Sequence, residues 1–313
     1  MNKTLLLIAV CAAAFAQQTP APPKAAVQTP LDVEDKNRIV LDVSRVNLLY
    51  SVTDRKGRFV TNLTKDDFAI IESKKPQEII EFTAESDLPL RLGILVDNSN
   101  SIRERFKFLQ EASIDFINGV IRPRQDKAVL VSFDSEAQLV ADLTDDKEKL
   151  ARAVRDMKPG GGTAMFDAVF FACRDKLMQD QPRHKFRRAI VLLGDGDDNA
   201  SRYTREQALE MAHKADVVIY TISTNITRIE SDGDKILKYM ASETGGQAFF
   251  PFKAQDLAQS FENISNELRH QYNVLYRPEP FKQDGLYHAV DVRVKARKDL
   301  VVRARKGYYA PKR

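Results

Sequence analysis

The chain has 313 residues, of which 43% are hydrophobic and 29% are charged. These proportions are typical of a globular protein with one large domain or two modest ones, and they argue against a disordered or fibrous chain. The formal net charge is +4, with Lys and Arg spread along the chain, so the charge does not indicate nucleic-acid binding and we expect no nucleic-acid partner.

Residues 1–16 have the pattern of a secretory signal peptide. Lys3 precedes an apolar run at 5–14, and residues 14–16 read Ala-Phe-Ala, a typical cleavage site. The run is shorter than the ~20 apolar residues that a membrane span needs, and Val10 fits poorly before a lipid-modified Cys11. We therefore expect a periplasmic or secreted protein that is cleaved after Ala16 and has no transmembrane segment in its mature form.

Cysteine usage agrees with this view of the chain. Cys11 leaves with the signal peptide, so Cys173 is the single cysteine of the predicted mature protein. No intrachain disulfide can then form. Cys173 lies on an apolar stripe of a predicted helix, and we expect it to be a small core residue.

A flexible linker and a β segment are predicted next. Residues 17–37 are rich in Ala, Pro and Gln, which is typical of an extended or disordered linker. Residues 38–87 form the N-terminal β segment, which shows no helical periodicity. Its first strand alternates Val46, Leu48, Tyr50 and Val52 with other residues. Further short β runs are predicted at 59–60, 66–72 and 77–82.

Strands and helices alternate over residues 88–270. Strands are predicted near 91–96, 127–133, 136–142, 187–194, 216–223 and 247–250, and helices near 101–121, 146–157, 164–178, 204–214, 233–244 and 254–270. Only a few residues separate the second strand from the third, too few for a parallel crossover, so this pair must be an antiparallel hairpin. The predicted fold class is α/β: a doubly wound, mostly parallel, Rossmann-like six-stranded sheet wrapped by helices.

The β pattern returns in residues 271–313, with strands predicted near 272–276, 288–294 and 300–304. Roughly four strands then precede the α/β domain and three follow it, and neither set alone buries a stable core. Together they suffice for a sandwich of about seven strands. We therefore expect 38–87 to pair with 271–313 in an all-β, sandwich-like unit into which the α/β domain is inserted. Two separate β extensions flanking the domain are the alternative.

Three polar loops contain the candidate metal-binding residues. Asp97, Ser99 and Ser101 follow the first buried strand of the α/β region, Thr163 follows three glycines, and Asp195 follows another buried strand. Ligands of open α/β sheets bind outside the carboxyl ends of the strands, so these side chains are expected to converge there. Carboxylate and hydroxyl oxygens suit Mg²⁺ or Ca²⁺.

These three loops, in this order, resemble the metal-ion-dependent adhesion site (MIDAS) of von Willebrand factor A domains. The resemblance implies that residues 88–270 are such a domain and that Asp97, Ser99, Ser101, Thr163 and Asp195 hold a divalent cation, Mg²⁺ or else Ca²⁺ or Mn²⁺. It also implies an adhesion-type module whose protein partner presents a carboxylate to the metal. Gly194 departs from the family pattern, which usually has Thr or Ser there, and we expect this to lower metal affinity.

A second resemblance spans nearly the whole mature chain. In a group of bacterial secreted proteins with related domains, a valine-rich strand, an Asp-x-x-Gly turn and a Leu-Thr-x-x-Asp-Phe segment precede the domain, and Arg-x-Gly-Tyr-Tyr closes the chain. The corresponding segments here are 52–57, 63–68 and 305–309. This resemblance concerns the architecture more than the activity.

Enzymatic interpretations have less support, and we expect no enzyme activity. None of the four histidines lies in a motif loop, and the sequence has no nucleophile elbow, zinc-protease motif or phosphate-binding loop. A calcium loop starting at Asp195 fails because Ala200 stands at its glycine position, so Asp197 and Asp198 are interpreted as solvated acids. Asp167 either hydrogen-bonds to a metal ligand or stabilises a helix start. A metal-assisted hydrolase and a structural envelope protein with a vestigial metal site are the alternatives.

Overall fold

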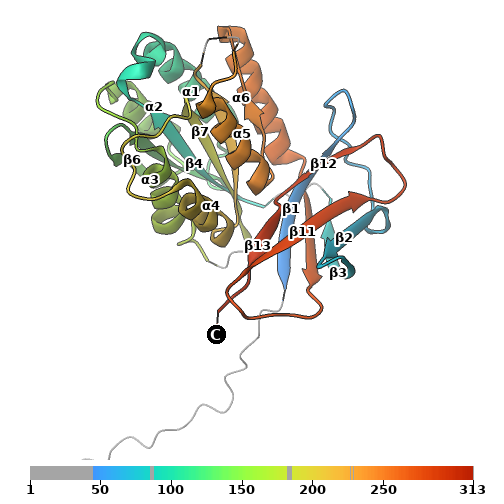
Figure 1. Cartoon of the computed structure of the whole chain (residues 1–313). Coiled ribbons are helices and arrows are strands. Elements are labelled where there is room, and N and C mark those ends of the chain that lie inside the picture. The colour runs from blue at the N-terminus through green and yellow to red at the C-terminus, as the bar shows by residue number, and fades with distance from the viewer. Residues whose placement is uncertain (1–44, 85–87, 182–184, 226, 228, 313) are drawn as a thin grey trace, which may run out of the picture. The chain divides into compact units, whose positions relative to one another are not determined.

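The computed structural model describes residues 45–84, 88–181, 185–225, 227 and 229–312 (Figure 1). The predicted signal peptide, the linker and residues 38–44 lie outside the described residues. None of the helices in the described ranges has the length and apolar content needed to cross a bilayer.

A six-stranded sheet forms the centre of the α/β domain, with strand order β6-β5-β4-β7-β8-β9. Its strands are β4 (Leu90–Asp97), β5 (Lys127–Phe133), β6 (Ala137–Thr144), β7 (Arg187–Gly194), β8 (Val217–Ser223) and β9 (Ala248–Phe249). All neighbours are parallel except β5 and β6, which pair antiparallel. The predicted fold class is therefore confirmed, including the hairpin at the sheet edge.

Helices cover both faces of this sheet. They are η2 (Asn100–Arg105), α1 (Phe106–Val120), α2 (Lys147–Asp156), α3 (Met165–Phe171), the π-helical turn η3 (Ala172–Leu177), α4 (Arg205–Lys214), α5 (Asp232–Thr244) and α6 (Ala254–Arg269). The predicted helices at 101–121 and 164–178 are thus each divided in two, because the hydrogen-bonding pattern changes within them. Cys173 is fully buried in the second of these, as expected for a core residue.

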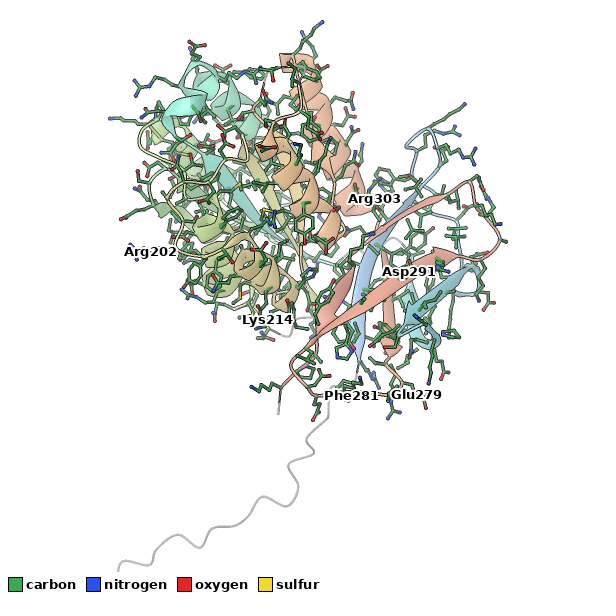
Figure 2. All side chains as sticks on the ribbon, viewed as in Figure 1. Arg202, Lys214, Glu279, Phe281, Asp291 and Arg303 are labelled. Carbon is green, nitrogen blue, oxygen red and sulfur yellow. The ribbon has the colours of Figure 1, made fainter. Side chains whose placement is uncertain are left out.

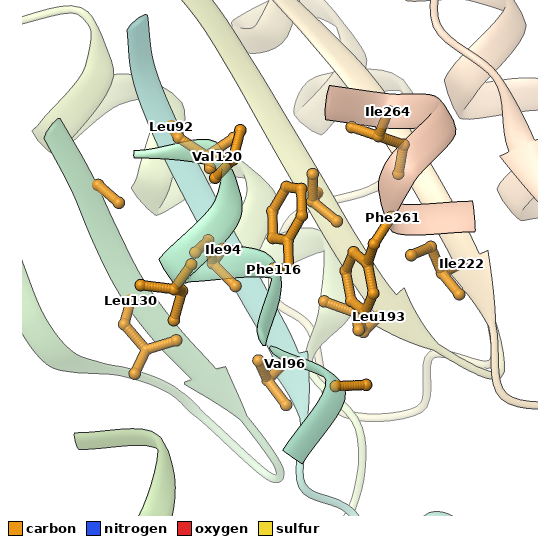
Figure 3. Packing of buried hydrophobic residues seen from close by; sticks show 14 of the residues in the cluster. Leu92, Ile94, Val96, Phe116, Val120, Leu130, Leu193, Ile222, Phe261 and Ile264 are labelled. Carbon is orange, nitrogen blue, oxygen red and sulfur yellow. The ribbon is translucent and has the colours of Figure 1, made fainter. Parts of the chain in front are cut away.

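Two apolar clusters explain why β4 is an uninterrupted hydrophobic run. Leu92, Ile94 and Val96 pack with α1, α2 and α6 on one face, while Leu95 packs with α3, α4 and α5 on the other. Strands buried on both faces need apolar residues at every position. Figure 3 shows the first cluster, in which the Phe116 and Phe261 rings stack with centroids 4.6 Å apart.

A seven-stranded antiparallel sheet is built from both ends of the described chain, in the order β12-β1-β10-β3-β2-β11-β13. Its strands are β1 (Val46–Thr53), β2 (Phe68–Glu72), β3 (Lys75–Thr83), β10 (Tyr272–Arg277), β11 (Tyr287–Val294), β12 (Val301–Ala304) and β13 (Gly307–Tyr309), and the short helix η1 (Lys65–Asp67) precedes β2. Strands from before and after the α/β domain are hydrogen-bonded to each other, so the α/β domain is inserted into this unit.

The antiparallel unit differs in detail from the expected sandwich. It is one sheet that curls around its core (Figure 1), and the described residues contribute three strands before the α/β domain and four after it. The difference arises because Phe59 forms only an isolated bridge with Thr53, whereas Gly307–Tyr309 forms a strand of its own. The alternating side chains of β1 point into this core as predicted: Val46, Leu48, Tyr50 and Val52.

Buried hydrogen bonds join the curled sheet to the α/β domain. The carboxylate of Glu267 on α6 is 1% exposed and accepts a hydrogen bond from the Ser51 hydroxyl at 2.6 Å. Arg303 of β12, labelled in Figure 2, forms a bidentate ion pair with the same carboxylate. Its Nε donates to Oε1 at 3.2 Å and its Nη2 donates to Oε2 at 3.0 Å. Through Glu267, these contacts join the end of α6 to both β1 and β12.

Candidate metal centre

Parallel pairing of β4 with β7 brings two of the predicted ligands together. Val96 lies opposite Leu193 in this register, so Asp97 at the end of β4 lies beside Gly194 and Asp195 at the end of β7. Ser99 and Ser101 follow in the turn that begins η2. Four of the five predicted residues therefore lie at the carboxyl edge of the sheet.

Asp97 is fully buried, and its two carboxylate oxygens differ in their surroundings. Oδ1 accepts the backbone N–H of Ser99 at 2.8 Å, whereas Oδ2 has no hydrogen-bond partner. Burial raises the pKa of Asp97 to about 6, and the negative charge of Asp195 adds to this shift, while the hydrogen bonds from Ser99 oppose it. An unpartnered buried carboxylate oxygen is costly unless a cation or a donor satisfies it.

Hydroxyl groups link the two loops that follow β4 and β7. The Ser99 and Ser101 hydroxyls lie 2.8 Å apart, within hydrogen-bond distance. The Ser101 hydroxyl in turn donates to Asp195 Oδ2 at 2.6 Å. Asp195 is half-buried and Ser101 is exposed, so this chain of oxygens leads from the buried Asp97 to the surface.

Thr163 joins the same cluster of loops through its backbone. Its N–H donates to Asn199 Oδ1 at 3.0 Å, and its carbonyl accepts the backbone N–H groups of Asn199 and Ala200 at 3.0 and 3.1 Å. The glycine run before it is tied to the first loop, because the Gly160 N–H donates to the Asn98 carbonyl at 2.7 Å. All three predicted loops thus meet at one place.

The model of the von Willebrand factor type A domain family matches residues 92–267 of this chain. The chain belongs to this family. A relative from Borreliella burgdorferi, described as an uncharacterized protein, is 27% identical over 154 residues, which cover 48% of this chain and 44% of the relative. The chain therefore spans less than half the length of that relative.

Solved structures show the same fold. A von Willebrand factor type A protein from Catenulispora acidiphila has a TM-score of 0.50 and 14% identity, covering 78% of this chain and 73% of its own. Proximal thread matrix protein 1 from the mussel byssus has a TM-score of 0.51 and 18% identity, covering 63% and 51%. A further structure of that mussel protein, with a zinc-occupied MIDAS motif, has a TM-score of 0.50 and 18% identity over 63% and 50%.

Gly194 is explained by the packing of this von Willebrand factor type A domain. A Cβ added at Gly194 would lie 3.0 Å from Asp97 Oδ2 and 3.2 Å from Asp97 Cβ. Both distances are tighter than ordinary van der Waals contact. A side chain at this position would require the Asp97 carboxylate to shift by a few tenths of an ångström, and glycine leaves it in its present position.

Glycines also permit the close approach of the Thr163 loop. Gly161 has a φ of +69°, which side-chain-bearing residues rarely adopt, and a Cβ there would lie 2.8 Å from Ser135 Oγ. A Cβ at Gly162 would lie 2.8 Å from Asn199 Oδ1. Gly161 and Gly162 therefore leave room where this loop contacts the β5–β6 turn and Asn199.

Asn199 and Asp198, near the centre, have structural roles that were not predicted from the sequence. Asn199 clamps the Thr163 loop, as described above. The prediction that Asp198 is a solvated acid is wrong, because its Oδ2 accepts the Phe166 N–H at 2.9 Å, at the start of α3, and the Ser201 hydroxyl at 2.6 Å. The prediction for Asp197 agrees with its exposure.

Asp167 lies in the first turn of α3, where an acidic side chain suits the helix start as one of the two expectations had it, and it also bonds to a neighbouring segment. Its Oδ1 accepts the backbone N–H groups of Arg202 and Tyr203 at 2.8 and 2.9 Å. It therefore orders the segment before α4. The run of Asp, Asn and Ser after Asp195 is the sequence signal that could have indicated such loop-ordering hydrogen bonds, since these residues commonly bond to nearby backbone groups.

The donor set fits a hard divalent cation. Between residues 45 and 312, the described positions contain no group of three or more His, Cys, Asp or Glu side chains placed to hold a metal ion. The centre instead offers two carboxylates and the hydroxyls of Ser99 and Ser101, oxygen ligands of the kind that Mg²⁺ accepts together with water, and Thr163 lies on a loop joined to both of these segments. The unpartnered Asp97 Oδ2 is the oxygen that such an ion or its water would satisfy.

Proposed function

We propose that this chain is an exported, adhesion-type protein-binding module that captures an acidic side chain of a partner through a divalent cation. Asp97, Ser99, Ser101, Thr163 and Asp195 would hold the cation, with Mg²⁺ the preferred ion and Ca²⁺ or Mn²⁺ as alternatives. The observation that carries the proposal is the buried Asp97 Oδ2 without a partner, at the place where three loops are tied together. Export rests on the signal-like pattern of residues 1–16.

Some residues of the candidate centre would supply charge to a bound cation, and others position those residues. A bound Mg²⁺ would supply the charge that compensates the two carboxylates and a coordination position for a partner's carboxylate. Ser99 holds the Asp97 carboxylate by its backbone N–H, and Ser101 holds the Asp195 carboxylate by its hydroxyl. Asn199 accepts the Thr163 N–H and so joins the Thr163 loop to the segment that follows Asp195. These contacts preorganise the oxygen ligands before an ion arrives.

Two observations support binding rather than catalysis. Three histidines are described, and each lies away from the candidate centre: His213 contacts Tyr287, His270 stacks on Phe59, and His288 pairs with Glu72 and Asp284. The mussel relative with a zinc-occupied MIDAS motif is a matrix protein by its name. We therefore propose that the chain has no enzyme activity.

Replacing the buried carboxylate tests the proposal. Asp97→Asn should abolish the stabilisation by Mg²⁺, which for one site is about 2.7 kcal/mol at a hundredfold excess over Kd. Without metal, the variant should unfold at a higher temperature than the wild type. Burial raises the pKa of Asp97 to about 6 in the wild type, so the ionised carboxylate costs on the order of 3 kcal/mol near neutral pH, and the Asn amide removes that charge.

Melting curves against MgCl₂ measure both effects. Thr163→Ala is the matched variant, because it removes a neutral oxygen and keeps both carboxylates; it should retain a reduced Mg²⁺ shift. Equal Mg²⁺ shifts in the wild type and in Asp97→Asn would place the cation elsewhere and contradict the proposal.

A further inference from the structure

The curled sheet and the α/β domain carry net charges of opposite sign. In the described residues of the curled-sheet unit, 45–84 and 272–312, Lys and Arg outnumber Asp and Glu by seven. In the described residues between 88 and 271, Asp and Glu outnumber Lys and Arg by four. Such an asymmetry between two parts of one chain points to an anionic partner for the basic part. The candidate metal centre lies in the acidic part, so the two surfaces are separate.

Three segments far apart in the sequence meet at one end of the curled sheet. They are the turn after β1, the segment that contains η1, and the loop between β11 and β12. Strand pairing brings them together, because β11 ends opposite the start of β2 and β12 begins opposite the end of β1. The Lys295 N–H also donates to the Asp67 carbonyl at 2.8 Å. Figure 1 shows the loop after β1 and the loop between β11 and β12 leaving the curled sheet on the same side.

Exposed cations are concentrated on these segments: Arg55, Lys56, Arg58, Lys65, Lys295, Arg297 and Lys298. Among the described residues, two of them form ion pairs, each within its own loop: Arg58 with Asp54 at 2.7 Å and Arg297 with Asp299 at 3.0 Å. The pKa of Asp299 is lowered, chiefly by the hydrogen bond from Arg297, and the charge of Arg55 contributes. The two loops therefore lie within electrostatic reach of each other, and the cations exceed the acids of all three segments by three.

An exposed apolar side chain borders these cations. Val301 begins β12 directly after the loop and is 47% exposed, whereas the next residue, Val302, packs against the core of the curled sheet. Val301 is therefore on the outer face of its strand, beside the charged loops. Charge attraction and apolar contact together are what hold a peripheral protein to the headgroup region of a bilayer.

We propose that the seven cations and Val301, together called the basic end, bind a membrane surface that contains anionic phospholipids. The cations stand on three separate segments, so each can meet a different headgroup of an extended surface. Export, which we propose for this chain, brings it to a lipid surface and away from nucleic acid. The inference needs no metal, because no predicted metal ligand belongs to the basic end.

Vesicle sedimentation of the full mature chain tests the proposal. The probes are phosphatidylcholine vesicles with and without phosphatidylglycerol, in EDTA so that the metal centre takes no part. A Lys near an anionic surface contributes about fivefold to binding. The quadruple variant Lys56→Gln, Lys65→Gln, Lys295→Gln, Lys298→Gln should therefore bind phosphatidylglycerol vesicles at least about a hundredfold more weakly. High salt should weaken the wild type as well, since exposed charges are screened.

A second quadruple variant separates the basic end from net charge. Lys107→Gln, Lys127→Gln, Lys149→Gln, Lys158→Gln removes the same charge from exposed positions of the α/β domain. It should bind the anionic vesicles within about twofold of the wild type, because these residues lie outside the basic end. Thermal melts of both variants check that they are folded, which is expected since all eight side chains are exposed.

Four outcomes would overturn the inference. The first is no binding of the wild type to phosphatidylglycerol vesicles, and the second is equal binding to pure phosphatidylcholine. The third is an equal loss of binding in both quadruple variants, which would make the effect one of net charge. The fourth is binding to soluble dextran sulfate without binding to vesicles, which would indicate a site for an anionic polymer. Each of them leaves the metal-dependent capture of a partner standing, since that is measured with Mg²⁺.

Discussion

Asn199 is the side chain that decides how closely two loops of the candidate centre approach. Its amide oxygen accepts the Thr163 N–H, and its own N–H donates back to the Thr163 carbonyl. Neighbouring Asp198 holds the start of α3 in the same way. Residues that are not predicted ligands thus position the loops that hold the predicted ligands. Precise metal sites usually depend on such supporting hydrogen bonds.

His213 is a buried histidine on α4 whose surroundings keep it neutral. It is 6% exposed and contacts the Tyr287 ring, with centroids 5.5 Å apart. Burial lowers its pKa to about 4, the charge of Arg305 adds to this effect, and Asp216 opposes it. An unfolded histidine titrates near pH 6.5. His213 therefore contributes stability above pH 6.5 that is lost as the pH falls from 6.5 to about 4.

This predicts a specific pH dependence. The free energy of unfolding should fall by about 2 kcal/mol between neutral pH and pH 5 on account of this residue alone. His213→Gln should lose that part of the pH dependence, although it will be less stable than the wild type at neutral pH. Urea unfolding of both proteins at the two pH values measures the difference. Parallel pH profiles for wild type and variant would show that His213 is not the group responsible.

Among the elements, the start of α5 is the one that supports the Asp195 loop most directly. Gly196 has a φ of +83°, and a Cβ there would lie 2.2 Å from the Gly233 carbonyl oxygen; a Cβ at Gly233 would lie 2.2 Å from the Asp195 carbonyl oxygen. The two backbones therefore touch with no room for a side chain. A shift of the start of α5 would therefore also shift the backbone that carries the Asp195 carboxylate.

Gly233→Ala should consequently weaken the metal centre. The added methyl group forces α5 and the Asp195 loop apart, so the Mg²⁺ affinity should fall and the melting temperature should decrease. Gly119→Ala is the control, because a Cβ at Gly119 in α1 meets nothing within 4 Å. That variant should be stabilised by up to about 1 kcal/mol, the usual gain of Ala over Gly in a helix.

Isothermal titration with MgCl₂ and thermal melts of the two variants provide the test. An unchanged Mg²⁺ affinity in Gly233→Ala, with the variant folded, would mean that the Asp195 loop adjusts independently of α5.

At the scale of the whole molecule, the curled sheet depends on both ends of the described chain. β1 lies between β10 and β12, and β2 lies between β3 and β11. The rings of Tyr50 on β1 and Tyr272 on β10 stack with centroids 5.6 Å apart in the core. Each strand that precedes the α/β domain is therefore hydrogen-bonded to at least one strand that follows it in the sequence.

Removing residues 272–313 should therefore cause aggregation. β1 would lose both neighbouring strands, and Leu48, Tyr50 and Val52, each at most 1% exposed, would face water. Burial of such a side chain contributes about 1.5–3 kcal/mol, and an unpaired apolar edge promotes association. Residues 88–270 alone keep both apolar clusters of the α/β domain and should remain monomeric and folded. Size-exclusion chromatography with light scattering measures both outcomes, and a folded, monomeric truncated chain would contradict the prediction.

The order of strands and helices in the α/β domain could be predicted from the sequence alone, and the five candidate ligand residues remain a prediction from the sequence. Apolar runs of strand length, helical periodicity and a link too short for a crossover are local features. The carboxyl ends of parallel strands meet at one edge, so the convergence of Asp97 and Asp195 could be predicted without coordinates.

The strand order of the curled sheet, the hydrogen bonds from Asn199 to the Thr163 loop and the missing partner of Asp97 Oδ2 depend on the folded chain. The strand pairs Ser51–Arg303 and Ile71–Asp291 join residues more than two hundred positions apart. The physical reason is that pairing, burial and charge balance depend on which side chains come together across the fold, and local periodicity does not carry that information.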